Sequence, residues 1–207
     1  MHPNPIFRGV EAARNIAFAR DRAFGVLSVN GSEGPLLAHV PFVLDAEGCE
    51  AELHLVRSNS IVRALLEPVQ AVIAVAGGDS YVSPDWYEVE DQVPTWNYVA
   101  VHLRGTLEQL PQDELRGVLD RLSADMEARL APKRPWVVGK MTPEVRDRMM
   151  RQIVPFRLRV TRIDGTWKLS QNKPDEARLR AADGVSDHGI GTGLEGLADL
   201  IRQRPKG

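Results

Sequence analysis

Cysteine and long apolar segments are scarce in this sequence of 207 residues, and each shortage excludes a class of protein. The one cysteine, Cys49, excludes a disulfide scaffold and any zinc or iron–sulfur site that needs several cysteines. No segment approaches the roughly 18 consecutive apolar residues of a membrane-spanning helix. Residues 1–15 lack the apolar core of a secretory signal. We therefore expect a soluble protein of the cytoplasm that has no membrane partner.

Common catalytic and nucleotide-binding motifs are also missing from the sequence. It contains no P-loop, no GxGxxG after a strand, no GxSxG and no HExxH. None of the five histidines lies four positions from another, so we expect no metal site. The neighbours of Cys49 in AEGCEAE include three carboxylates, which argue against a reactive thiolate at this position.

Charge is nearly balanced over the whole chain but unevenly placed along it. The formal net charge is −2, yet Asp45–Glu127 carries a net charge of −11 and Arg129–Lys168 a net charge of +8. Such asymmetry is typical of an anion-binding surface or of a self-complementary contact between subunits. The alternative is that the arginines and lysines simply solvate a helix and one face of a strand.

The first part of the chain reads as one helix followed by strands. Apolar spacing predicts a helix over 9–22. Two apolar runs then flank Asn30-Gly31 and a third follows Glu47-Gly48, which predicts a meander of three strands with hairpin turns. A short helix should begin within Ser58–Ser60 and end before Pro68.

The rest of the chain alternates long strands with helices. The expected elements are a buried strand over 69–77, an ordered loop over 80–95, a strand over 96–110, an amphipathic helix over 111–130 and a helix after Thr142-Pro143. A strand pair, 153–163 and 166–172, should turn at Asp164-Gly165. The end should hold marginal helices over 174–184 and 193–205 and a flexible joint over 188–196. Consecutive hairpins with inserted helices predict an α+β antiparallel barrel rather than a Rossmann sheet.

The segment 53–66 combines groups that suit a phosphate. A strand ends at Arg57 and a helix starts within Ser58–Ser60, so a guanidinium, hydroxyls and unpaired helix N–H groups meet there. The alternative is a capped helix that carries a surface arginine.

Aromatic residues gather in one part of the chain. Five of the twelve lie within eighteen positions: Tyr81, Trp86, Tyr87, Trp96 and Tyr98. Such a segment suits the wall of a planar ligand, or a small core beneath a long loop. In the motif WKLSQN, Lys168, Gln171 and Asn172 supply donors that are complementary to a heterocycle with carbonyl groups, unless they form a solvated hairpin end.

Taken together, five segments resemble one protein family. They are AHVPFVLD (38–45), HLVRSNSIVRAL (54–65), YVSPDWY (81–87), VPTWNYVAVHLRG (93–105) and WKLSQN (167–172). The chain resembles the PaiB-type FMN-binding negative transcriptional regulators of bacteria over residues 1–184. This resemblance implies a split antiparallel β-barrel with peripheral helices, similar to pyridoxamine-phosphate oxidases, that binds FMN at the interface of a homodimer. We expect an FMN-binding domain over 1–184 and a C-terminal tail with a marginal helix over 185–207.

The resemblance also implies which residues contact the cofactor. It assigns the phosphate to Arg57, Ser58 and Asn59 and places His39 along the flavin. It assigns contact with the flavin ring, or with the pocket wall that the partner subunit contributes, to six residues: Trp96, Asn97, Tyr98, Trp167, Lys168 and Gln171. The chain departs from the family where Ser58-Asn59-Ser60 replaces the expected Ala-Asn-Pro, although serine keeps a hydroxyl for a phosphate.

Three functions follow from these expectations. The first is a flavin-sensing repressor, for which Arg129–Lys168 is the one DNA-binding candidate, because we find no helix-turn-helix pattern. The second is an FMN-dependent oxidoreductase or flavin reductase that uses NAD(P)H, with Lys168 favouring the anionic reduced flavin. The third is a flavin-free binding or scaffold protein, whose pocket is vestigial or binds another planar ligand such as haem.

Overall fold

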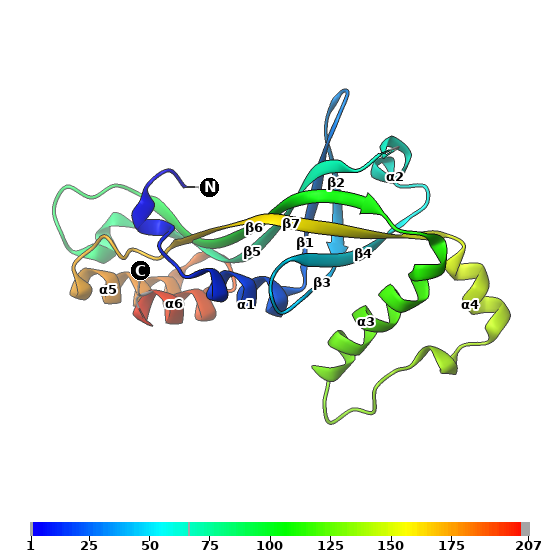
Figure 1. Ribbon diagram of the computed structural model, residues 1–207. Helices are drawn as coiled ribbons and strands as arrows, with labels where there is room; N and C mark the ends of the chain where they lie inside the picture. Colours follow the sequence, from blue (N-terminus) through cyan, green and yellow to red (C-terminus); the bar gives the residue numbers. More distant parts are fainter. Residues whose placement is uncertain (1, 66, 204–207) are drawn as a thin grey trace. The chain divides into compact units, whose positions relative to one another are not determined.

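The computed structural model describes residues 2–65 and 67–203, which form two compact units (Figure 1). Unit 1 contains the described residues of Met1–Ala17, Val75–His102 and Asp164–Gly207, and unit 2 contains Phe18–Ala74 and Leu103–Ile163 without residue 66. Three long strands contribute residues to both units: β5 (Val69–Val82), β6 (Thr95–Gln109) and β7 (Ile153–Lys168).

The sheet has the strand order β2-β1-β5-β6-β7-β4-β3, and β8 pairs with β5 outside this path. The pairings β1/β2, β1/β5, β3/β4, β4/β7 and β5/β8 are all antiparallel. The shorter strands are β1 (Phe24–Gly31), β2 (Gly34–Pro41), β3 (Val43–Leu44), β4 (Glu50–Val56) and β8 (Ile190–Thr192).

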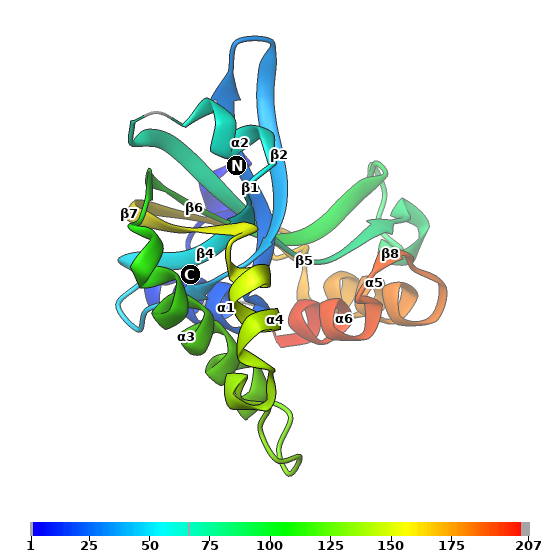
Figure 2. The same cartoon turned by 90° about the vertical axis from the view of Figure 1, so that its right-hand side faces the viewer.

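A barrel closes within unit 2, because β2, at one end of the strand order, contacts β4 near the other end (Figure 2). Burial alternates along β1 and β6, as expected for strands with one face in a core. Fully buried side chains fill the interior: Leu27, Leu53, Ile73, Leu103 and Phe156. The predicted fold, an α+β split antiparallel barrel with peripheral helices, is confirmed.

Three helices of unit 2 agree with the sequence patterns that predicted them: α2 (Ser60–Ala64), α3 (Leu115–Ala128) and α4 (Pro143–Met150). The short η3 (Gln112–Glu114) lies at the start of the helix predicted over 111–130, and η4 (Val138–Lys140) was not predicted. Helix α3 packs against β4 and buries Leu115, Val118 and Leu122, which lie three and four positions apart. Helix α1 (Ala12–Arg22), which also follows the prediction, begins in unit 1 and ends in unit 2.

Unit 1 contains two further predicted helices, α5 (Asp175–His188) and α6 (Leu194–Gln203), which lie side by side (Figures 1 and 2). Alanines of α5 and aliphatic residues of α6 are buried: Ala177, Ala181, Ala182, Leu197, Ala198 and Ile201. Short helical turns lie at η1 (Pro5–Phe7) and η2 (Pro84–Tyr87). The final residues of the helix predicted over 193–205 lie outside the described part of the chain.

The predicted strand pair 153–163 and 166–172 is wrong, because β7 runs unbroken through Asp164-Gly165 to Lys168. Glycine is required here by a close neighbour rather than by a turn. A Cβ atom on Gly165 would lie 2.1 Å from the side-chain oxygen of Asn15. The flexible joint predicted over 188–196 is also wrong, because Ile190–Thr192 forms β8, and the Thr192 hydroxyl donates to Asp79 Oδ2 at 2.8 Å.

The predicted three-strand meander is present, but its first turn is shifted and its middle run is divided into two strands. β2 pairs with β1, and β3, from the same apolar run, pairs with β4, which also pairs with β7. The β1–β2 turn lies at Ser32-Glu33, since Gly31 is paired with Gly34. Between β3 and β4, the Asp45 carboxylate accepts hydrogen bonds from the backbone N–H groups of Cys49 at 2.7 Å and Glu50 at 3.0 Å, and the Cys49 thiol is exposed.

None of the helices in the described residues has the length and apolar character needed to cross a membrane. The described residues also contain no group of three or more His, Cys, Asp and Glu side chains that is arranged to hold a metal ion.

Candidate functional site

The segment after β4 starts a helix as its sequence suggests. Asn59 is the N-cap of α2, and its Oδ1 accepts a 2.9 Å hydrogen bond from the backbone N–H of Ile61. This bond fixes the direction of the backbone at the start of the helix. Ser58 and Ser60 flank the cap, and both are exposed.

A hollow of about 390 Å³ lies beside this segment in unit 2. Ser58, Ser60 and Arg63 line it, together with Glu33 from the β1–β2 turn. Ser60 and Arg63 are three positions apart in α2, so they lie on neighbouring positions of one helix face. Two hydroxyls and a guanidinium form a donor set that suits a phosphate. The chemistry of this hollow therefore fits the phosphate of a nucleotide such as FMN.

Arg57 does not line the hollow. Its Nε donates to the backbone oxygen of Arg151 at 3.1 Å, and its Nη2 donates to Gln112 Oε1 at 3.0 Å. Gln112 in turn donates to the backbone oxygens of Met150 at 3.3 Å and Ile153 at 3.1 Å. Arg57 is thus attached to the end of α4, while Ser58 faces the hollow.

His39 lies on β2 in unit 2 and is exposed. Its ring stacks on Phe24 of β1, with a centroid separation of 6.4 Å and an interplanar angle of 29°. Phe24 itself is 48% exposed. The two rings form a flat aromatic surface on the β1–β2 hairpin that can receive a further planar group.

The six candidate residues of unit 1 divide by exposure. Trp96 is exposed, and Tyr98 and Lys168 are half-buried. Trp96 and Tyr98 are two positions apart on β6 and therefore project from the same face of the strand. The other three side chains are buried: Asn97, Trp167 and Gln171. Contact with a ligand in unit 1 is thus open to Trp96, Tyr98 and Lys168.

Asn97 belongs to a buried group with Ser170 and Tyr87, here called the Ser170 cluster. The Asn97 amide donates to the Ser170 hydroxyl at 2.7 Å, and the Tyr87 hydroxyl lies 2.9 Å from the same oxygen. Ser170 has a left-handed backbone, with φ of 56°. Burial raises the pKa of Tyr87, although its hydrogen bond with Ser170 acts in the opposite direction. The cluster joins η2, β6 and the turn after β7.

Trp167 and Gln171 bind to the N-terminal part of unit 1. The Trp167 indole donates to Asn15 Oδ1 at 2.8 Å, and the Arg14 guanidinium lies 4.6 Å above the ring centre. Gln171 accepts from the Leu169 N–H at 2.7 Å and donates to the Trp167 and Ile6 carbonyls at 2.6 and 3.2 Å. These bonds fix the conformation of the 167–172 turn.

Lys168 is the candidate of unit 1 that carries a charge. Its ammonium donates to the Thr95 hydroxyl and lies 5.9 Å from the centre of the Phe7 ring. Burial lowers the pKa of Lys168, and the nearby charge of Lys173 lowers it further. Thr95 precedes Trp96, so a cationic donor lies close to the exposed aromatic strand face. This combination suits a planar ring that carries carbonyl groups.

The structure thus distributes the ten candidates over both units. His39, Arg57, Ser58 and Asn59 lie in unit 2, and the other six lie in unit 1. The sequence analysis missed the hollow-lining Arg63, although its spacing of three from Ser60 is a usable signal. It also missed Ser170, whose role depends on partners 73 and 83 positions away.

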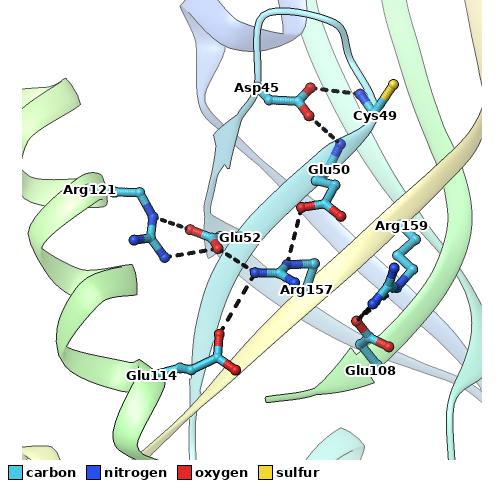
Figure 3. A network of polar contacts seen from close by, with 9 residues as sticks. All are labelled: Asp45, Cys49, Glu50, Glu52, Glu108, Glu114, Arg121, Arg157 and Arg159. Atoms are coloured by element: carbon cyan, nitrogen blue, oxygen red, sulfur yellow. Dashed lines mark hydrogen bonds and ion pairs between the residues drawn. The ribbon is translucent and has the colours of Figure 1, made fainter. Parts of the chain in front are cut away.

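The charge asymmetry of the sequence is largely matched inside unit 2 (Figure 3). Glu52 of β4 accepts from Arg121 Nε at 2.6 Å and from Arg157 Nη2 at 3.0 Å. Arg157 also pairs with Glu50 at 3.4 Å. Burial by itself would raise the pKa of Glu52, but hydrogen bonds from the two arginines outweigh burial and lower the pKa.

These pairs reduce the free positive charge of Arg129–Lys168. At least five of its eleven basic residues contact carboxylates: Arg129, Lys133, Arg146, Arg157 and Arg159. Binding to duplex DNA depends on cations that can neutralise phosphates. The segment is therefore a weaker DNA-binding candidate than its net charge implies.

Comparisons with known proteins show the family to which the chain belongs. The family model described as "Putative FMN-binding domain" matches residues 1–162. The chain is 28% identical over 158 residues to the protease synthase and sporulation protein PAI 2 of Bacillus subtilis, and the match covers 75% of each sequence.

Two solved structures share the fold. The FAD and heme binding protein from Mycobacterium smegmatis has a TM-score of 0.56 at 18% identity, with 78% of this chain and 73% of that chain covered. The flavocytochrome Anf3 from Azotobacter vinelandii has a TM-score of 0.51 at 11% identity, with 81% and 72% covered. At these identities the similarity concerns the fold alone.

Proposed function

The chain belongs to this FMN-binding family and FMN is its cofactor, and from that premise we propose that it is a PaiB-type negative transcriptional regulator. The protein acts as a homodimer in the bacterial cytoplasm, and its repressor activity depends on bound flavin. The regulatory role rests on the resemblance of the five sequence segments to the PaiB-type regulators, and the relative in Bacillus subtilis is named for protease synthesis and sporulation.

The observation that carries the flavin site is the hollow beside α2. Ser58, Ser60 and Arg63 provide the donors for the FMN phosphate. His39 of the same unit stacks on Phe24 and provides an aromatic surface for the ring. In unit 1, Trp96, Tyr98 and Lys168 form an aromatic strand face with a cationic donor, which suits a planar ring by itself. When bound, FMN supplies a redox-active ring, and the chain supplies its binding and orientation.

The β1–β2 hairpin supports the proposed homodimer. Phe24 is 48% exposed and Leu37 is 59% exposed, and both lie beside His39 on paired strands. Large apolar side chains grouped on a surface mark contact sites in proteins. A second copy on this surface would bring its own residues to the aromatic platform of His39 and Phe24.

Titration with FMN tests the site through flavin fluorescence. Arg63→Ala should weaken binding about 10- to 150-fold, because a charge-assisted hydrogen bond to phosphate contributes on the order of 1.5–3 kcal/mol. Arg57→Ala should weaken it less, because Arg57 does not line the hollow. Arg148→Ala, an exposed change on α4, is the control.

Riboflavin separates the phosphate from the ring. Because it has no phosphate, its affinity should be the same for the wild type and Arg63→Ala. An unchanged FMN affinity in Arg63→Ala would place the phosphate elsewhere. A wild-type protein that takes up no FMN would overturn the proposed function.

The mode of repression is tested by a gel-shift assay at increasing salt. Direct binding to duplex should weaken steeply with salt, because phosphate contacts release counterions. Since much of Arg129–Lys168 is paired with carboxylates, we expect no such binding by the protein alone and infer that repression requires a further component. A tight, salt-sensitive complex would contradict this.

A further inference from the structure

A second cavity of unit 2 has a different chemistry from the hollow beside α2. It has a volume of about 180 Å³ and lies between α3, α4, the η4 segment and the start of β7. Its walls are mainly apolar and include Leu119, Trp136, Met141, Met149 and Met150. It shares no lining residue with the hollow beside α2.

The size and lining of this cavity suit one aromatic ring. An apolar cavity of about 150 Å³ is large enough to bind benzene. Methionine side chains are flexible and polarisable, and they adapt to aromatic partners. Trp136 is 38% exposed and Met149 is 53% exposed, so the cavity has an open side through which a ligand can enter.

Two arginines make the cavity suitable for an anion. Arg116 and Arg146 line it among the apolar side chains. Each makes an ion pair through Nε, Arg116 with Asp120 at 2.8 Å and Arg146 with Asp147 at 2.7 Å. Each guanidinium also carries N–H groups on its terminal nitrogens, which can donate to a carboxylate. Asp120 also lines the cavity, but its charge is paired with Arg116, whereas Asp147, the partner of Arg146, does not line it. Arg146 therefore offers the positive charge to a negative ligand.

An adjoining hollow gives the ligand more length. Its volume is about 490 Å³, and it shares Arg116, Asp120, Ser123, Trp136 and Val138 with the apolar cavity. A ring in the apolar cavity can therefore carry a substituent or a second fused ring that extends past Trp136. The arginines at the side of the cavity fix where the charge of such a ligand lies.

We propose that this cavity binds a small aromatic carboxylate. The ring packs among Leu119, Trp136 and the methionines, and the carboxylate accepts hydrogen bonds from Arg146 and Arg116. The site goes beyond the proposed flavin function, since none of its residues belongs to the flavin candidates. It gives the protein a place for an effector molecule.

Isothermal titration of the FMN-loaded protein with 1-naphthoate tests the proposal. We expect saturable binding at one site per chain and an unchanged flavin absorption spectrum. Arg146→Gln should weaken binding about tenfold or more, because a charge-assisted hydrogen bond is lost. The neutral 1-naphthalenemethanol should bind wild type and Arg146→Gln equally. Arg134→Gln, a change outside the cavity, should leave naphthoate binding unchanged.

A second variant is designed to fill the cavity with a larger side chain. Val138 lines the cavity from the half-buried η4 turn, so Val138→Trp should abolish naphthoate binding while the protein still takes up FMN. Absence of binding to wild type at millimolar naphthoate would overturn the proposal. So would release of FMN by naphthoate, or equal binding by wild type and Val138→Trp. If the protein still takes up FMN, these outcomes contradict only the proposed binding of an aromatic carboxylate in this cavity. They leave the proposed flavin site unaffected.

Discussion

The Ser170 hydroxyl accepts a 2.7 Å hydrogen bond from the Asn97 amide, and both side chains are buried. Tyr87 completes the cluster with its hydroxyl at 2.9 Å. One small side chain in a left-handed turn thereby connects β6 and η2 to the end of β7. The aromatic strand face of unit 1 depends on this buried polar group for its position.

Ser170→Ala should lower the free energy of unfolding by about 1–3 kcal/mol, because two buried polar partners lose their bond. Ser170→Gly also removes the hydroxyl but suits the left-handed backbone, so it should be less destabilising than alanine by about 1 kcal/mol. Urea unfolding measures both changes. An equal decrease in the free energy of unfolding in the two variants would show that the left-handed φ of 56° does not disfavour alanine at this position.

Gly165→Ala should destabilise the protein by about 1–3 kcal/mol through overpacking. The added Cβ would meet the Asn15 side chain, whose oxygen accepts from the Trp167 indole at 2.8 Å. Gly196→Ala on α6 is the matched control, since no heavy atom lies within 4 Å of its new Cβ. There alanine should be neutral or stabilising by about 0.5–1 kcal/mol, because it favours the helix. Thermal unfolding of both variants tests the pair.

Glu52→Gln should remove part of the pH dependence of stability. The folded pKa of Glu52 lies below its ordinary value of 4.5, so the unfolded chain binds more protons near that pH. The stabilisation is therefore full above pH 4.5 and is lost as the pH falls through the folded pKa.

At neutral pH, Glu52→Gln should lower the free energy of unfolding by about 1–2 kcal/mol. This decrease is smaller than for a fully buried ion pair, because the Arg121 side chain is half exposed to solvent. The measurement is urea unfolding at several pH values between neutrality and strong acid. The difference between wild type and variant should shrink in acid. A constant difference would contradict the assignment of the lowered pKa to Glu52.

Arg180→Ala should loosen the turn that contains Trp86 and Tyr87. Arg180 of α5 donates to the Tyr87 carbonyl at 2.7 Å and pairs with Glu88 at 3.2 Å. We expect faster hydrogen exchange at residues 84–94 with little change in global stability, because Arg180 is partly exposed. Leu179→Ala, an exposed neighbour on α5, should leave this exchange unchanged.

The sequence was a good guide to elements whose signals are local. The cap at Asn59, the spacing of Leu115, Val118 and Leu122, and Thr142-Pro143 each predicted the helix that the structure contains. Such signals depend on residues within one or two turns of each other. Such signals can therefore be interpreted correctly without knowledge of the tertiary structure.

Signals that depend on distant partners were misleading. Asp164-Gly165 has the composition of a hairpin turn, but its glycine accommodates Asn15, which lies far away in the sequence. In the same way β4 pairs with β7, about a hundred positions further along, a pairing that its local hairpin with β3 does not predict.

In the candidate site, too, local features were predicted from the sequence, whereas features that depend on distant residues were not. Sequence located the segment around Ser58 but not the orientation of Arg57, which is decided by Gln112 and Arg151. It also named Asn97 and Gln171 as residues facing the cofactor, whereas their side chains are buried in hydrogen bonds to distant parts of unit 1. Their contact with flavin remains a prediction.

The exposed thiol of Cys49 provides a single attachment point for a probe. It lies in the turn held by Asp45, outside the candidate flavin residues and the apolar cavity. A nitroxide label on the wild-type chain would place one spin on each copy, so no engineered cysteine is needed. Pulsed electron resonance would then detect a defined spin–spin distance in a homodimer, and a single copy would give none.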